Sequence, residues 1–147
     1  MIDTNNAVRI ALLPIVSDWA RVDYPHLTLV YAGKVEDLNP GEFNEMAKDA
    51  SSLASISRPI TLKVMGLEHF GGGDNDPQVD ALRVRPTEEL MAMRRFVENW
   101  NASDWPFNPH ITTGDLGTFV GEVPMYIGFD RIAVNWGDEC LTFSMRS

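Results

Sequence analysis

The chain has one cysteine, three histidines and few basic residues, and each scarcity excludes a class of protein. Cys140 cannot form a disulfide within the chain, which favours a reducing compartment, and we expect it to be a small apolar strand residue. Twelve lysines and arginines stand against 21 aspartates and glutamates, giving a net charge of −9. Proteins that bind long nucleic acids usually cluster basic residues to neutralise many phosphates. We therefore expect no long nucleic acid as a partner, whereas a small phosphate ester remains compatible.

Long hydrophobic runs are missing as well. The longest, Ile10 to Val16, contains Pro14 and is far too short to cross a bilayer. Arg9 interrupts the first apolar stretch, which argues against a signal peptide, so we expect a cytoplasmic protein (in the host cytoplasm if a phage encodes it). A hydrophobic content of 44% over 147 residues is enough for a substantial core, and we predict one domain over residues 1–147.

The hydrophobic pattern alternates between strands and helices. Asn39-Pro40-Gly41-Glu42 and Pro86-Thr87-Glu88-Glu89 are typical helix starts, and apolar residues follow both at helical spacing. The glycine-rich segment 71–77 lacks the lysine and Ser/Thr of a P-loop, which favours a strand connection over a phosphate cradle. Strands are expected over residues 7–16, 26–32, 59–67, 78–85, 107–113, 125–134 and 139–145.

Two of the three histidines lie in the same local pattern. His26-Leu27-Thr28 and His110-Ile111-Thr112 are both His-x-Thr, both directly follow a proline, and both lie in strand-like sequence. On a strand, residues two apart project from the same face at a separation of roughly 6.5–7 Å. Each histidine and its threonine are therefore too far apart to hydrogen-bond each other well, but they can converge on one small group.

A phosphate suits such a pair, because its oxygens accept hydrogen bonds from both imidazole and hydroxyl groups. Two facing His-x-Thr strands would place two imidazoles around one phosphorus. One neutral imidazole could take a proton from the attacking oxygen while a protonated one donates to the leaving oxygen. The alternative is that both are ordinary strand histidines in unrelated places.

In these motifs the chain resembles the 2H phosphoesterase superfamily, which includes 2′-5′ RNA ligase-like proteins and 2′,3′-cyclic nucleotide phosphodiesterases. The order of helices and the final hairpin also agree, so the resemblance covers nearly the whole chain. The matching segments are PHLTLVYAG at 25–33, ITLKVMGLEHFG at 60–71 and FNPHIT at 107–112.

The resemblance implies a bilobal α+β fold, with two antiparallel sheets flanking a central cleft and helices outside. It implies that His26 and His110 are the general acid and base, that Thr28 and Thr112 hold phosphate oxygens, and that no metal or other cofactor is needed. The second motif continues with Thr113-Gly114-Asp115, where the family commonly has Leu-Ala-Arg. Without that basic residue, binding of highly charged, terminally phosphorylated ends is in doubt.

We therefore expect a metal-independent phosphodiesterase acting on a small nucleotide. Candidate substrates are a 2′,3′-cyclic phosphate, a 2′-5′ linkage or a cyclic oligonucleotide signal. Compact members of this superfamily can destroy cyclic nucleotide signals in antiviral defence, a role that would suit a small acidic phage protein. The alternative is a non-catalytic nucleotide-binding module, acting as a sensor or sponge on the same fold. The oligomeric state is left open.

Six further residues have two interpretations each. Trp19 and Tyr24, in the loop entering the first motif, either stack on a base or cap the core. His69 either borders the cleft or is an ordinary turn residue. Lys63, Arg83 and Arg85 lie in expected strands, where one of them could face phosphate. Arg83 and Arg85 share a face, which a solvated edge explains equally well.

Overall fold

The computed structural model describes residues 6–20, 22, 24–71 and 78–146. Most of the predicted glycine-rich connection lies outside these residues. The elements follow the predicted order, and the observed bounds differ from the predictions by a few residues. They are β1 (Ala7–Pro14), β2 (Leu27–Lys34), α1 (Pro40–Ile56), β3 (Ile60–Phe70), β4 (Val79–Val84), α2 (Glu88–Val97), β5 (His110–Asp115), β6 (Tyr126–Trp136) and β7 (Glu139–Ser144), with 3-10 turns at Val35–Asp37 and Glu98–Trp100.

Both helices begin where the sequence predicts. Before α1, the backbone N–H of Asn39 donates to Glu42 Oε1 at 3.1 Å, and Pro40 occupies the first turn, where its missing N–H has no cost. The hydroxyl of Thr87 caps α2 by accepting from the backbone N–H of Leu90 at 3.1 Å. These contacts satisfy amide groups that a helix start otherwise leaves unpaired.

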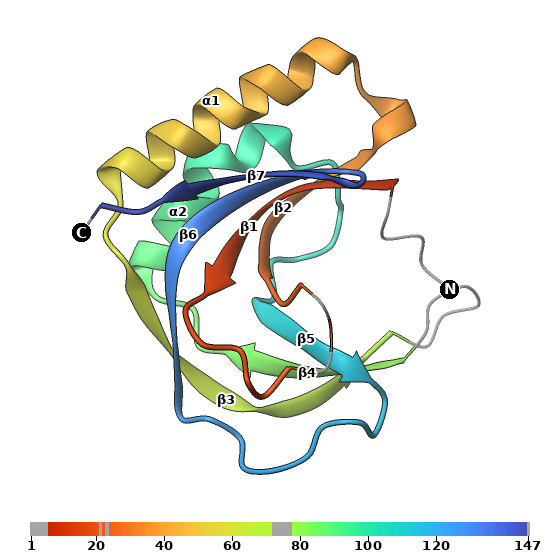
Figure 1. The fold of residues 1–147 in the computed structure, drawn as a ribbon, viewed down its shortest axis with the longest axis vertical. Helices are drawn as coiled ribbons and strands as arrows, with labels where there is room; N and C mark the ends of the chain where they lie inside the picture. Colours follow the sequence, from red (N-terminus) through yellow and green to blue (C-terminus); the bar gives the residue numbers. More distant parts are fainter. Residues whose placement is uncertain (1–5, 21, 23, 72–77, 147) are drawn as a thin grey trace.

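The strands form one antiparallel sheet in the order β1-β2-β5-β4-β3-β6-β7, and β1 also pairs with β6. Six strands therefore form a closed circuit, which Figure 1 shows as a strongly curled sheet. Strand β6 closes it, because Tyr126–Phe129 pairs with β3, Phe129–Trp136 with β1, and Arg131–Trp136 with β7. The α+β antiparallel architecture is confirmed, although hydrogen bonds join the two expected sheets into one. The predicted pseudo-symmetry of two lobes stays a prediction.

Helices α1 and α2 lie together against one side of the curled sheet, α1 over β6 and β7 and α2 beside β2 (Figure 1). Alternate strand residues such as Leu27, Leu29 and Ile111 enter a continuous core with helix residues Met46 and Leu90. Because successive strand residues point to opposite faces, the residues between them occupy the other face of the sheet.

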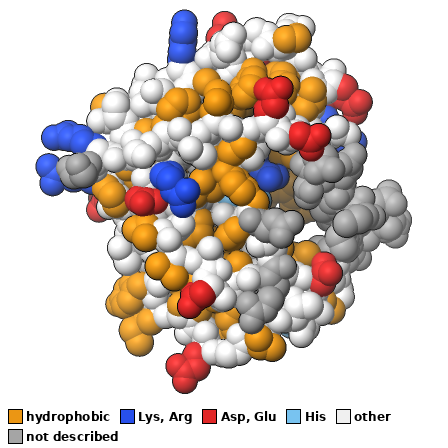
Figure 2. Space-filling view, in the orientation of Figure 1, with side chains coloured by type: hydrophobic (Ala, Val, Ile, Leu, Met, Phe, Trp, Pro, Cys, Tyr) orange, Lys and Arg blue, Asp and Glu red, His pale blue; other side chains and the backbone are white. Residues whose placement is uncertain are grey.

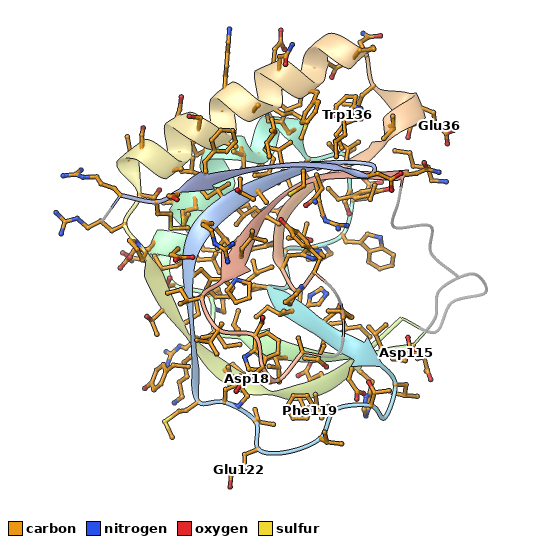
Figure 3. All side chains as sticks on the ribbon, in the orientation of Figure 1. Asp18, Glu36, Asp115, Phe119, Glu122 and Trp136 are labelled. Carbon is orange, nitrogen blue, oxygen red and sulfur yellow. The ribbon has the colours of Figure 1, made fainter. Side chains whose placement is uncertain are left out.

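Aromatic residues extend this core at its edge. Phe43 of α1 stacks on Trp136 of β6 with 5.2 Å between ring centroids, and Figure 3 shows Trp136 beneath α1. Such offset stacking adds to the free energy gained by burying both rings. Among the described residues, no helix is both long and apolar enough to span a bilayer.

His69 belongs to a structural contact between β3 and β4. Its Nδ1 lies 2.9 Å from Oδ1 of the buried Asp80, its partner across the two strands. The other carboxylate oxygen accepts from the backbone N–H of Phe119, in the loop after β5. Backbone hydrogen bonds from Phe119 and Gly117 lower the pKa of Asp80, so the carboxylate stays charged. His69 therefore helps to fasten a loop. It lies within strand β3 and not in a turn, because β3 extends three residues beyond the predicted strand 59–67.

Candidate active site

The strand register brings the two His-x-Thr motifs together. Antiparallel strands β2 and β5 pair at Leu27 and Ile111. Continuing that register by one residue each way places His26 opposite Thr112 and Thr28 opposite His110. Directly opposed residues have Cβ atoms about 4.5–5.5 Å apart, and diagonal neighbours such as the two histidines about 7–8 Å. His26, Thr28, His110 and Thr112, the quartet, thus share one small patch.

The quartet lies on the face of the sheet that points away from the helices, which we call the motif face. Its floor is made of alanines: Ala11 pairs with Thr28, Ala81 with Thr112, and Ala133 with Ala11. All three alanines are buried, yet none joins the core beneath the helices. Figure 2 shows a hollow near the centre of this view, with histidine and basic side-chain atoms beside it.

Both histidines are oriented in the same way. Nδ1 of His26 lies 2.9 Å from the backbone oxygen of Tyr24, and Nδ1 of His110 lies 2.7 Å from that of Asn108. A carbonyl oxygen only accepts, so Nδ1 is the donor in each pair. The second ring nitrogen, Nε2, is then left as the atom that exchanges a proton, with the tautomer fixed by the backbone two residues earlier.

The environment of His26 favours the neutral imidazole. Burial, the charge of Arg9 and, more weakly, that of His110 lower its pKa from 6.5 to about 4, against the opposing effect of the Tyr24 carbonyl. His26 therefore holds an unprotonated Nε2 at neutral pH. The electrostatic effect of His110 on His26 agrees with the placement of the two histidines on neighbouring strands.

His110 has a different environment. The ring of Phe70, from the end of β3, stacks on it with 4.3 Å between centroids and 15° between planes. A positively charged imidazole over an aromatic face is electrostatically favourable. Arg83 is the cross-strand neighbour of His110 and pairs with Glu68 at 3.3 Å. Among Lys63, Arg83 and Arg85, Arg83 is thus the one that lies next to the quartet, and the carboxylate of Glu68 already pairs with it.

The threonine hydroxyls are free to bind a ligand. Neither Thr28 nor Thr112 hydrogen-bonds through its hydroxyl to another residue in the described parts of the chain, and both side chains are partly exposed. Asp115, the acidic residue of the second motif's continuation, is exposed at the other end of β5 (Figure 3). It lies five residues beyond His110 and three beyond Thr112, roughly 16 and 10 Å along an extended strand, so its carboxylate does not contact the quartet.

Tyr24 and Trp19 occupy different surroundings. The rings of Tyr24 and His26 have centroids 6.4 Å apart, and the Tyr24 hydroxyl contacts Cys140 Sγ at 2.8 Å. Trp19 packs against the core and lines a hollow of about 320 Å³ with Pro124 and Tyr126. The quartet does not line this hollow. Tyr24 thus lies beside the quartet, Trp19 has the contacts of a capping residue, and base stacking by either stays a prediction.

Arg9 and Asn135 are residues of this face that the sequence analysis did not select. They are direct cross-strand neighbours on β1 and β6, and Arg9 Nε and Asn135 Oδ1 are buried without a hydrogen-bond partner among the described residues. Burial lowers the pKa of the Arg9 guanidinium, which still stays protonated at neutral pH. A signal was present in the sequence, because Arg9 is the one charged residue within the strand 7–16.

The donor set of the quartet is that of an acid–base site. No group of three or more His, Cys, Asp or Glu side chains in the described ranges is arranged to hold a metal ion. The expectation of a reaction without a metal stays a prediction that chelation can test.

Comparison with known proteins places the chain in a family. Two solved structures cover nearly all of it: TT0787 of Thermus thermophilus (TM-score 0.65, 17% identity, 96% of this chain and 98% of that one) and Usb1 of Kluyveromyces marxianus (TM-score 0.64, 11% identity, 99% and 100%). LigT of E. coli complexed with 3′-AMP is also similar (TM-score 0.56, 15% identity, 96% and 95%).

At these identities the likeness establishes the fold. No curated protein matches the chain. The sequence itself matches the pattern of the 2′-5′ RNA ligase superfamily over residues 16–135, a stretch that contains both motifs. The chain therefore belongs to the 2′-5′ RNA ligase superfamily, as the two His-x-Thr motifs predicted.

Proposed function

We propose that the protein is a phosphodiesterase that cleaves a phosphodiester in a small nucleotide by two-histidine acid–base catalysis. The observation that carries this proposal is the pairing of β2 with β5, which assembles two imidazoles and two hydroxyls on one patch. Membership of the 2′-5′ RNA ligase superfamily supports it. So do neighbours of the same fold whose structures hold small nucleotides, namely LigT with 3′-AMP or ATP and Usb1 with uridine monophosphate.

The different surroundings of the two histidines support different roles for them. His26, whose pKa is lowered to about 4, is the general base: its Nε2 takes a proton from water or from a ribose 2′-hydroxyl as that oxygen attacks phosphorus. His110 is the general acid: stacked on Phe70, it gives its Nε2 proton to the departing ribose oxygen as the P–O bond breaks. The two threonine hydroxyls donate to the non-bridging oxygens.

The substrate is a small phosphate ester with a ribose next to the scissile bond. A 2′,3′-cyclic phosphate, a 2′-5′ linkage and a cyclic oligonucleotide all meet that requirement. The net charge of −9 disfavours binding of a long polyanion, because a negatively charged protein surface repels phosphates that lie beyond the quartet and its neighbours. A cytoplasmic location and a role against cyclic nucleotide signals are part of the same proposal.

Product analysis tests the proposal directly. The purified protein is incubated with 2′,3′-cyclic mononucleotides, 2′-5′ oligoadenylate and 3′-5′ cyclic di- and trinucleotides, and the products are separated by chromatography. We expect hydrolysis of at least one class, unchanged by EDTA. Tight binding without turnover would support the sensor alternative instead, and activity that disappears with EDTA would replace the two-histidine mechanism with metal catalysis.

The lowered pKa of His26 sets the pH dependence. The base is active when neutral, so kcat/KM is lost as the pH falls through the pKa of His26 in the free enzyme. We expect a bell-shaped profile with its acid limb near pH 4, below that of an ordinary imidazole. Rates measured across the acid and neutral range check this, and NMR titration of His26 in the free protein gives the same pKa independently. An acid limb at or above the ordinary imidazole value of about 6.5 would contradict the assignment of His26 as base.

A further inference from the structure

A row of polar residues crosses the motif face next to the quartet. Tyr31 of β2, Arg9 of β1, Asn135 of β6 and Cys140 of β7 are successive cross-strand partners. Tyr24 reaches over to the end of this row, where its hydroxyl contacts Cys140. The next motif-face residue of β1 is Ala11, whose partner on β2 is Thr28. Since Ala11 ends at its Cβ, no longer side chain of β1 stands between the Arg9 row and the quartet.

No carboxylate among the described residues neutralises the charge of Arg9. Arg9 forms no ion pair with any described residue, whereas Arg83 pairs with Glu68 and Arg131 with Asp130. Tyr24 does not provide a counter-charge, because burial and the hydrogen bond to Cys140 raise the pKa of its phenol and keep it neutral. Burying an unpaired cation is unfavourable, and such groups persist where a ligand supplies the missing partner.

Asn135 gives the same indication independently. It is only 7% exposed, and its buried Oδ1 lacks a hydrogen-bond partner among the described residues, beside the equally unpartnered Nε of Arg9. Buried polar atoms in folded proteins are almost always paired, so two orphans on adjacent strands mark a place where a bound group or water completes the structure. Arg9 also acts electrostatically on His26, which places its charge within reach of the quartet.

We propose that Arg9, with Asn135 beside it, forms an anion subsite on the motif face that binds phosphate oxygens of the substrate. This inference rests on the proposed function, because it assigns a binding role within the same site. The guanidinium offers several hydrogen-bond donors to phosphate oxygens. The amide of Asn135 both donates and accepts, so it can bind a hydroxyl of the substrate next to that phosphate. The phosphate is either the scissile one or a second phosphate on the same nucleotide.

Four variants test the subsite. Arg9→Met removes the charge and keeps an unbranched stem, and Arg9→Lys keeps the charge without the planar fork. Asn135→Asp leaves Arg9 in place but gives it a carboxylate partner, whereas Asn135→Ser adds no charge. As a control, Arg95→Met, on the exposed side of α2, makes the same charge change away from the site.

We expect Arg9→Met and Asn135→Asp to raise KM roughly 10- to 100-fold, the loss typical of a charged hydrogen bond, with a smaller change in kcat. Arg9→Lys and Asn135→Ser should stay within about tenfold of the unaltered protein and Arg95→Met within about twofold. Arg9→Met should not lower the melting temperature, since it removes an unpaired buried charge. Values of KM for Arg9→Met and Asn135→Asp within about twofold of the unaltered protein would overturn the subsite while leaving the phosphodiesterase intact.

A pH profile separates the charge of Arg9 from a structural role. The groups that face His26 are Arg9 from β1, Tyr24 from the preceding loop and His110 from β5. Arg9 disfavours the imidazolium, so removing it raises the pKa of His26. We expect Arg9→Met to move the acid limb of kcat/KM upward by roughly half a pH unit or more. An unmoved limb would count against placement of this charge beside the quartet.

Binding without turnover keeps the two proposals distinguishable. In NMR titrations with inorganic phosphate, the imidazole signals of His26 should respond, and Arg9→Met but not Arg95→Met should weaken the apparent affinity. That result would support the subsite even if no tested nucleotide were hydrolysed, whereas equal affinity for both variants would overturn it. Cyclic mononucleotides with and without a 5′-phosphate show which phosphate Arg9 binds. If Arg9→Met weakens the binding of both nucleotides equally, Arg9 binds the scissile phosphate. If it weakens only the binding of the 5′-phosphorylated nucleotide, Arg9 binds the second phosphate.

Discussion

Replacing either histidine of the quartet by alanine is expected to reduce kcat by about 10²- to 10⁴-fold, the usual contribution of a positioned acid or base. His26→Ala removes the atom that accepts the proton of the attacking group, and His110→Ala removes the proton that the departing oxygen needs. Because both act in one transition state, the double variant should be little slower than the slower single variant. Single-turnover and steady-state rates on the hydrolysed nucleotide check both expectations.

His69→Ala is the matched control for the histidine variants. It removes the third imidazole of the chain, which contacts Asp80 and lies outside the quartet. We expect it to retain activity, measured below its melting temperature. Circular dichroism should show that the two quartet variants keep the fold, since neither His26 nor His110 belongs to the core beneath the helices. Near-normal turnover in either quartet variant would contradict the two-histidine mechanism.

Removing one threonine hydroxyl has the second largest expected effect. Thr28→Val and Thr112→Val keep the shape of the side chain and delete one donor to the phosphate. The loss of a hydrogen bond to a charged group corresponds to about 1.5–3 kcal/mol, so kcat/KM should fall roughly 10- to 150-fold in each variant. Steady-state rates at a substrate concentration well below KM measure this ratio directly.

Serine in place of threonine distinguishes hydrogen bonding from packing. Thr28→Ser and Thr112→Ser retain the hydroxyl and lose only a methyl group, so activity should stay within several-fold of the unaltered protein. Thr118→Val is a suitable control, because that hydroxyl donates to the backbone oxygen of Asp115 in the loop after β5. If valine and serine variants lost activity equally, the threonines would serve packing and not phosphate binding.

The sequence was sufficient to predict which residues of each motif share a face of the sheet. Alternation along each motif strand predicted that His26 and Thr28 share a face, and Leu27 is buried in the core, as that alternation requires. Helix starts at Asn39 and Thr87 were also predictable, because capping depends on residues only three positions apart. Such local rules need no knowledge of the neighbouring strand.

The partners across strands could not be read from the sequence. Periodicity does not specify which strands are neighbours or in what register they pair. The position of His26 opposite Thr112 could therefore be found only from the folded structure. For the same reason Arg9 had no visible connection with Asn135, more than a hundred residues later. The separate surroundings of Trp19 and Tyr24 depend on how the loop before β2 crosses the sheet, and loop paths follow from tertiary packing more than from local sequence.

The closing strand β6 has a consequence for biosynthesis. Strands β1 and β6 are separated by more than a hundred residues, yet their pairing closes the circuit of six strands. In the same circuit, β2 and β5 are joined by a single residue pair. Contacts so distant in sequence form late, because the intervening chain must first emerge and fold. A nascent chain on the ribosome will therefore contain both motifs before the sheet that holds the quartet is closed.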